Sequence, residues 1–96
     1  MPFSLIQPLS ELPIAVLDVE TTGASADLGD RVIEVGIARY ERGQRVAEYE
    51  QLINPMRRIG PGITALTGIT PQMCADQPTF GEQFEPMINV LNHLAK

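Results

Sequence analysis

Residues 14–23 read IAVLDVETTG, an apolar run that leads directly into two carboxylates and a turn. The continuous apolar run over residues 14–17 predicts a short strand that is buried on both faces. Asp18 and Glu20 follow two residues apart, so we expect both side chains on the same face of the strand. Such a pair suits Mg²⁺, which usually takes one or two carboxylates together with water and substrate phosphates. For an isolated pair of this kind, the alternative is a solvated strand end without a ligand.

A second strand is predicted over residues 31–40 (RVIEVGIARY), because polar and apolar residues alternate there. Ile33, Val35 and Ile37 fall on one face, and Glu34 and Gly36 fall on the other. We interpret Glu34 as a polar contact of the sheet, with support of the carboxylate pair as the alternative.

The next residues complete a hairpin. Residues 41–44 (ERGQ) predict a tight turn, because Gly43 readily adopts a positive φ. Residues 45–53 then return as an antiparallel strand that ends at Asn54-Pro55. Arg39, Arg42 and Arg45 alternate with acidic residues around this hairpin, which favours cross-strand pairing over a nucleic-acid patch.

The second half predicts helices. Residues 63–70 (ITALTGIT) predict a helical turn that ends near Gly68, and Thr70-Pro71 is a typical helix start. The spacing of Thr79 and Glu82 is that of a capping box. One apolar stripe then follows at helical spacing, with a kink or late start at Pro86: Phe80, Phe84, Met87, Ile88, Leu91 and Leu94. We expect Met73 and Cys74 to pack in the core.

Composition limits the function classes. The chain has 96 residues, 44% of them hydrophobic and 20% charged, which is typical of one small globular domain. Its net charge of −5 argues against bulk electrostatic capture of nucleic acid or of an anionic membrane, but it permits nucleic acid met through a metal ion. No apolar run approaches the length of a membrane span, and no Lys or Arg precedes Arg31 to begin a secretory leader. One cysteine and one histidine exclude a structural zinc site, and the single Cys74 favours a reducing, cytoplasmic setting.

Four motifs together resemble the DEDD-type (DnaQ-like) 3′→5′ exonucleases, a family that includes the proofreading subunits of bacterial replicative polymerases. The first is DVETTG (residues 18–23), and the others are VIEVG (32–36), INP (53–55) and LTGITP (66–71). Ala75, Pro78 and Phe80 also fit the family spacing, so the resemblance covers about residues 13–94. It implies an α/β, ribonuclease H-like mixed sheet with helices, present only as its N-terminal portion: three strands, then helices. Residues 1–12 would be a lead-in, and residues 13–96 would be that portion of the exonuclease domain.

The resemblance also implies roles for single residues. Asp18 would bridge two Mg²⁺ or Mn²⁺ ions, and Glu20 would bind one of them and help to position the attacking water. Thr21, Thr22 and Gly23 would meet the 3′-terminal nucleotide. A wall against the terminal sugar and base would come from Leu66, Thr67 and Ile69. The implied substrate is a single-stranded or frayed 3′ end of DNA or RNA, the product is a nucleoside 5′-monophosphate, and DNA polymerase subunits are implied partners.

The chain departs from the family pattern in its catalytic groups. In the family, three motifs supply the four metal-ligand carboxylates and the general base, and this chain contains only the first of them. The second motif, an HN-x-x-FD-like sequence, and the third, with the base histidine, are absent. Asp76 matches neither, and we interpret His93 as a solvated helical residue. We therefore expect weak or absent metal binding, an inactive and marginally folded chain, and an open sheet edge prone to self-association. The alternatives are a non-catalytic half-domain that binds a polymerase or partner chain, and a truncated gene product. Arg57-Arg58 would either contact a phosphate of the entering strand or be a solvated loop pair.

Overall fold

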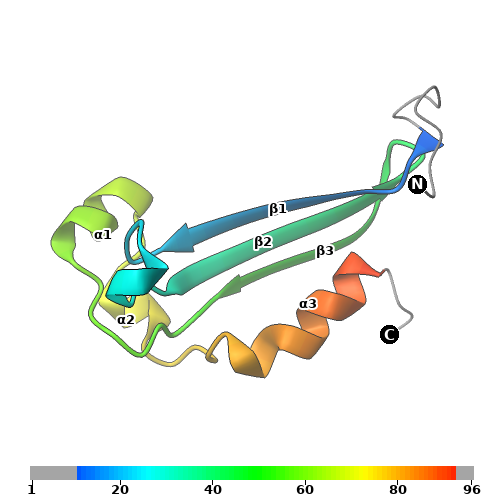
Figure 1. Cartoon of the computed structure of the whole chain (residues 1–96). Helices are drawn as coiled ribbons and strands as arrows, with labels where there is room; N and C mark the ends of the chain where they lie inside the picture. Colours follow the sequence, from blue (N-terminus) through cyan, green and yellow to red (C-terminus); the bar gives the residue numbers. More distant parts are fainter. Residues whose placement is uncertain (1–10, 93–96) are drawn as a thin grey trace.

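The computed structural model describes residues 11–92, which form a three-stranded antiparallel sheet followed by helices (Figure 1). The strands are β1 (Ile14–Thr21), β2 (Val32–Glu41) and β3 (Gln44–Leu52), in the spatial order β1-β2-β3. A short 3₁₀ helix, η2 (Ala26–Leu28), lies between β1 and β2. The predicted strands are confirmed. β2 lies between the other two, and its inward face carries Ile33, Val35 and Ile37, all at most 4% exposed.

The predicted burial of β1 on both faces is wrong. Val16 is 51% exposed and Leu17 is 62% exposed, so this apolar strand is open to solvent. The physical reason is its position: among the described residues, β1 pairs only with β2 and lies at an edge of the sheet. The helix α3 (Phe84–Leu91) packs on β2 and β3 and leaves β1 uncovered. The open edge that the sequence predicts is therefore present in residues 11–92.

Two irregularities set the register of the sheet. The β2–β3 hairpin turns at Arg42 and Gly43, whose φ angles of 53° and 77° suit a tight turn. The register then shifts beside Arg39 and Tyr40, which makes Val46 an extra residue on β3. A second shift lies between Glu20 and Thr21, directly after the carboxylate pair, where Ile33 is the extra residue on β2. Bulges of this kind bend a strand and change which face later side chains occupy.

Two short helices lie at the end of the sheet where β1 finishes (Figure 1). The helix α1 (Pro61–Thr67) ends at Gly68, as predicted, and the φ of 79° at Gly68 makes it a left-handed cap. The helix α2 (Pro71–Cys74) is capped at its N-terminus by Thr70, whose hydroxyl accepts a hydrogen bond from the Met73 amide at 3.2 Å. Cys74 packs with Ile33, Ile59 and Ile69, as expected. Met73 is 42% exposed, so its predicted core position is wrong: it lies on the outer side of a one-turn helix.

The last elements are η3 (Gly81–Gln83) and α3. Glu82 reaches back to the Thr79 amide at 2.8 Å, which is half of the predicted capping box. Pro86 lies in the first turn of α3, so the predicted late start is confirmed. Met87 is buried against Val35, Ile37 and Ile53, with Val90 and Leu91 beside it. Phe80 and Phe84 are 42% and 57% exposed, so the stripe is buried only where the helix faces β2 and β3.

Three antiparallel strands followed by helices match the order of elements that the resemblance implies. Leu94, His93 and most of the proposed lead-in lie outside the described residues. Within residues 11–92, no helix has the length and apolar character needed to cross a membrane.

Candidate metal and nucleotide site

Asp18 and Glu20 occupy the same face of β1, as their spacing predicts. Asp18 is paired across the sheet with Gly36, and Glu20 is paired directly with Glu34. A like-charged pair at directly opposite positions destabilises an antiparallel sheet. Nothing in the packing requires three acids here, since Asp18 is exposed and Glu20 and Glu34 are only half-buried. Packing and stability therefore give no reason for this arrangement of acids.

The third strand adds one more acid to this face. Glu50 is paired with Gly36, so Gly36 lies between Asp18 and Glu50 in one row across the sheet. Because Gly36 has no side chain, the row contains a hollow of about 220 Å³, lined by Asp18, Val19, Glu20, Glu34, Gly36 and Glu50. We call this the acidic hollow. It opens on the face of the sheet opposite to α3.

The charges in the acidic hollow influence one another. The pKa of Glu34 is raised, first by partial burial and then by the negative charges of Glu50, Glu20 and Asp18. Both effects disfavour the ionised carboxylate. A cation bound among these groups would relieve the same repulsion, so the electrostatics favour a positively charged ligand.

The turn after β1 is held by Asp30. The Thr22 hydroxyl donates to one Asp30 carboxylate oxygen at 3.0 Å, and the Ser25 amide donates to the other at 3.0 Å. These two hydrogen bonds are the largest causes of the lowered pKa of Asp30, and the nearby Arg57 and Arg31 add to them. Gly23 has no room for a side chain, because a Cβ there would lie 2.5 Å from the Asp30 carboxylate. The turn is thus a tied loop of fixed shape.

Each predicted nucleotide-binding residue has a defined place. Thr21 donates its hydroxyl to the Gly23 carbonyl, and Thr22 lies above Asp30, so both threonines shape the turn next to Glu20. Leu66 is 82% exposed on α1, and Thr67 donates its hydroxyl to the Ile63 carbonyl at 2.8 Å. Ile69 is 4% exposed and packs inside the core, which leaves Leu66 as the apolar side chain presented to solvent.

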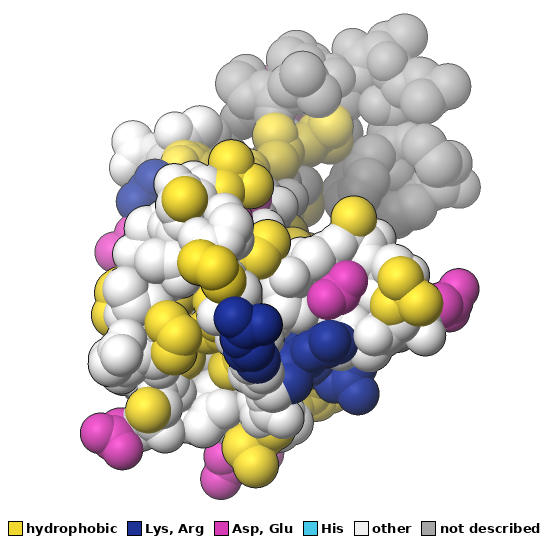
Figure 2. Space-filling view, turned by 90° about the vertical axis from the view of Figure 1, so that its left-hand side faces the viewer, with side chains coloured by type: hydrophobic (Ala, Val, Ile, Leu, Met, Phe, Trp, Pro, Cys, Tyr) yellow, Lys and Arg dark blue, Asp and Glu magenta, His cyan; other side chains and the backbone are white. Residues whose placement is uncertain are grey.

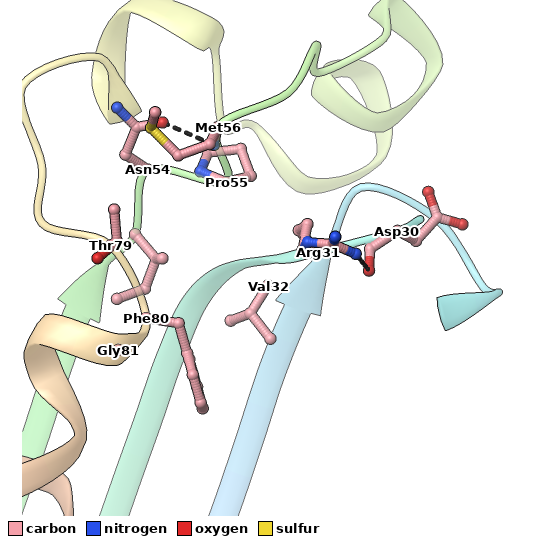
Figure 3. A pocket seen from close by; sticks show the side chains of 10 residues that line it. Asp30, Arg31, Val32, Asn54, Pro55, Met56, Thr79, Phe80 and Gly81 are labelled. Atoms are coloured by element: carbon pink, nitrogen blue, oxygen red, sulfur yellow. Dashed lines mark hydrogen bonds between the residues drawn. The ribbon is translucent and has the colours of Figure 1, made fainter. Parts of the chain in front are cut away.

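A second hollow lies at the same end of the sheet, between the start of β2, the Asn54-Pro55 turn and η3 (Figure 3). Its volume is about 340 Å³, and it is lined by Asp30, Arg31, Val32, Ile53, Asn54, Pro55, Met56, Thr79, Phe80 and Gly81. Arg31 and Arg57 border a shallower depression beside it. We call the two together the arginine hollow. At the far hairpin, Arg45 contacts Tyr40 across the strands, but its ion pair with Glu48 lies within β3 and that of Arg39 with Glu41 lies within β2, so the predicted pairing of opposite charges runs along the strands and not between them.

The metal-binding capacity of the described chain is limited. In residues 11–92, no three His, Cys, Asp or Glu side chains converge closely enough to hold one metal ion. Asp18 and Glu20 fit a divalent cation by their chemistry and by the negative surroundings of Glu34 and Glu50. Their number fits a weak site that keeps most of its ligands as water.

Two residues of the site, Glu50 and Asp30, have no signal of their own in the sequence. Glu50 reaches the acidic hollow only because the extra residue Val46 shifts β3 by one position; without that bulge it would lie on the opposite face. Asp30 follows a turn of variable length, so its partnership with Thr22 and Ser25 depends on how residues 24–29 fold. An acidic residue just before an alternating strand is the only available hint.

Comparisons with known proteins identify relatives of this chain. A family model described as "Exonuclease" matches residues 15–96. The DNA polymerase III subunit epsilon-like protein of Rhodobacter capsulatus is 39% identical over 77 residues, which are 78% of this chain and 11% of that protein. A solved structure of Exonuclease X in complex with 5′ overhanging duplex DNA superposes with a TM-score of 0.63 and 30% identity, covering 77% of this chain and 42% of that one. A 3′-exonuclease solved with a histone mRNA stem-loop has a TM-score of 0.74 at 19% identity, covering 93% of this chain and 35% of that one.

Proposed function

The chain belongs to the exonuclease family matched over residues 15–96, and from that premise we propose that it carries the metal-binding part of a 3′→5′ exonuclease site. The observation that supports this most strongly is the acidic hollow. Asp18 and Glu20 lie on one face of β1, with Glu34 directly opposite Glu20. The chain spans less than half of the solved exonucleases described above, so the activity of a whole enzyme is part of the proposal.

Asp18 and Glu20 would hold Mg²⁺ or Mn²⁺ by their carboxylate oxygens. When bound, such ions lower the pKa of water and stabilise the oxygens of a phosphodiester displacement. Glu20 would orient the water beside the scissile phosphate. Thr21, Thr22 and Gly23 would place the 3′-terminal nucleotide next to these carboxylates, because their turn is fixed by Asp30. Leu66 would present an apolar surface to the terminal sugar and base.

Turnover requires groups that residues 11–92 do not supply. No His lies in that range, and no third carboxylate converges with the first two on a single ion. General-base catalysis is worth about 10²–10⁴-fold, so the chain by itself should bind far better than it cleaves. The substrate we propose is a 3′ end of DNA, since the relatives include an epsilon-like polymerase subunit and a DNA-bound exonuclease. An RNA 3′ end is the other candidate.

A second candidate function is a non-catalytic module that binds a polymerase or another chain. It is favoured by one observation, the exposure of Val16 and Leu17 on β1, which within residues 11–92 pairs on one side only. Binding through this edge would not need the carboxylates, so the two functions are separable by substitution.

The test is binding of a nucleoside 5′-monophosphate, the proposed product, followed by amide chemical shifts with and without Mg²⁺. We expect Mg²⁺-dependent shifts at Asp18, Glu20 and Thr22, and we expect Asp18→Asn to abolish them. The matched control is Asp76→Asn, which makes the same charge change at an exposed site that fits no motif. Binding that ignores Mg²⁺, or that survives Asp18→Asn, would contradict the proposed function. Cleavage of a 5′-labelled oligonucleotide at a rate matching Exonuclease X would show that the chain needs no further groups.

A further inference from the structure

Basic side chains gather at one end of an otherwise acidic chain. Arg31, Arg57 and Arg58 are three of seven Lys and Arg residues in a chain of net charge −5, and all three are exposed. Figure 2 looks onto this end of the molecule and shows dark blue side chains next to one another, with yellow hydrophobic ones around them. Arg39, Arg42 and Arg45 belong to the hairpin at the other end of the sheet. Two of the three, Arg31 and Arg57, line the arginine hollow, so its local charge is opposite to that of the whole chain.

The backbone around the arginine hollow is held in an uncommon shape. Met56 has a φ of 54°, a backbone angle that residues other than Gly, Asn and Asp rarely adopt. The Met56 amide donates to the Asn54 side-chain oxygen at 2.8 Å, and the Asn54 amide donates to the Pro78 carbonyl at 2.8 Å. These contacts turn Met56 outward, where it is 74% exposed. Backbone strain together with an exposed apolar side chain is characteristic of binding sites.

An aromatic ring forms part of the wall. Phe80 is 42% exposed and lies beside Val32 in the hollow (Figure 3). Its position is set by the hydrogen bond between Thr79 and Glu82 and by the start of η3. An exposed ring that borders a basic surface is the combination by which proteins bind unpaired nucleotides: the base stacks on the ring and the cations contact the phosphates.

The charges remain net positive after the local acid is counted. Arg57 donates from Nη1 to the Leu28 carbonyl at 3.3 Å and lies 3.7 Å from the Asp30 carboxylate. Arg31 donates from its own Nη1 to the Asp30 carbonyl at 3.3 Å. The two Asp30 oxygens accept from Thr22 and Ser25, so that carboxylate is directed into the turn. Among the residues that line the arginine hollow, two arginines, Arg31 and Arg57, stand against one acid, Asp30, which leaves an anion-attracting surface.

We propose that the arginine hollow binds one nucleotide of a single-stranded nucleic acid, with its base on Phe80 and its phosphate between Arg31 and Arg57. The depression beside Phe80, about 340 Å³ in volume, suits one base, and the neighbouring depression bordered by Arg31 and Arg57 would take the phosphate. A base can enter only when it has left its duplex stack. The arginine hollow is connected to the turn that follows Glu20 and β1. The Thr22 amide donates to the Arg31 carbonyl at 2.8 Å, and the Arg31 amide donates to the Thr22 hydroxyl at 2.9 Å. This inference rests on the proposed function for its choice of nucleic acid, but it needs no metal ion.

The test uses the full chain and a fluorescently labelled single-stranded oligonucleotide, with anisotropy measured in EDTA so that the metal-binding carboxylates are not engaged. Arg31→Gln/Arg57→Gln should weaken binding about tenfold and reduce the slope of log affinity against log salt by about 1 to 1.5. Phe80→Leu should weaken it about fivefold or more, since one stacked base is lost. The matched control, Arg42→Gln/Arg45→Gln, makes the same charge change at the hairpin and should leave affinity within about twofold.

A measurement on the unsubstituted chain keeps the test independent of variant folding. Amide shifts on addition of the oligonucleotide should map to Arg31, Met56 and Gly81, and a blunt duplex of equal length should bind more weakly. Equal losses in the arginine-hollow and hairpin variants, or shifts elsewhere on the surface, would overturn the inference. Binding in EDTA reports the arginine hollow alone, whereas the Mg²⁺-dependent amide shifts of Asp18 and Glu20 report the metal site. Failure of the metal site and failure of the arginine hollow therefore give different results.

Discussion

Replacing Glu34 by Gln should stabilise the protein at neutral pH. Glu34 is directly opposite Glu20, and Asp18 and Glu50 are its diagonal neighbours in the two ladders. A like-charged pair at opposite positions costs about 0.2–1 kcal/mol, and water screening limits the diagonal contributions. We expect Glu34→Gln to raise the free energy of unfolding by about 0.5–1 kcal/mol, which raises Tm by about 2–8 °C in a chain of this size.

The pH dependence of this effect has a definite sign. The pKa of Glu34 is raised above its ordinary value of 4.5 in the folded state, mainly by burial. Between the ordinary and the raised value, the folded state binds more protons than the unfolded state, so stability falls as pH rises through that window. Glu34→Gln removes this loss. Its advantage should be full at about pH 7.5 and should vanish below about pH 4.

The assay is thermal unfolding by circular dichroism in EDTA at both pH values. Glu48→Gln is the matched control, because Glu48 lies on the same face of the sheet but is paired with Arg45 at 2.7 Å, so its loss should be neutral or slightly destabilising. Added Mg²⁺ should reduce the difference between Glu34→Gln and the unsubstituted chain. A Glu34→Gln variant that is less stable than the unsubstituted chain at neutral pH, or a gain that persists at low pH, would refute the electrostatic reasoning.

Three further changes test the packing and the tied turn. Met87→Ala should lower the free energy of unfolding by about 2–5 kcal/mol in urea titrations, because Met87 is buried. Phe84→Ala, at a residue that is 57% exposed, should lower it by less than about 1 kcal/mol. Equal losses in the two variants would show that α3 does not pack as described. Gly23→Ala should cost about 1–3 kcal/mol because its Cβ meets the Asp30 carboxylate, whereas Gly81→Ala, with open space around it, should be neutral within about 0.5 kcal/mol. Asp30→Asn should lower the free energy of unfolding at neutral pH, and this difference should disappear in acid as pH falls through the lowered pKa of Asp30. A difference that stays constant with pH would show that the ionised Asp30 carboxylate does not hold the turn.

The hairpin and the carboxylate pair could be predicted from the sequence because their signals are local. Alternation over residues 31–40 gave the face of Ile33, Val35 and Ile37, and Gly43 marked the turn. The spacing of Asp18 and Glu20 placed both on one face without knowledge of any neighbour. The helix starts at Thr70 and the left-handed end at Gly68 were predictable for the same reason, since caps depend on adjacent residues.

The features that could not be predicted depend on contacts between distant segments. Burial of Val16 and Leu17 depends on what covers β1, and a run of apolar residues does not specify its neighbours. The place of Glu50 depends on one bulged residue, Val46, which has no distinguishing side chain. The arginine hollow combines three segments, residues 30–32, 53–56 and 79–81, that are remote in the chain. Arg57 was visible in the sequence only as a charged loop residue.

The most direct measurement is a Mn²⁺ titration followed by electron paramagnetic resonance, which distinguishes free from protein-bound ion. We expect weak binding, with half-saturation at about 0.1–1 mM, as in other weak carboxylate sites. It also predicts that Asp18→Asn/Glu20→Gln abolishes this binding, whereas Asp76→Asn/Glu85→Gln, with the same charge change at exposed positions, preserves it. Bound Mn²⁺ that is lost equally in both double variants, or no bound Mn²⁺ in the unsubstituted chain, would contradict the assignment of Asp18 and Glu20 as the metal-binding pair.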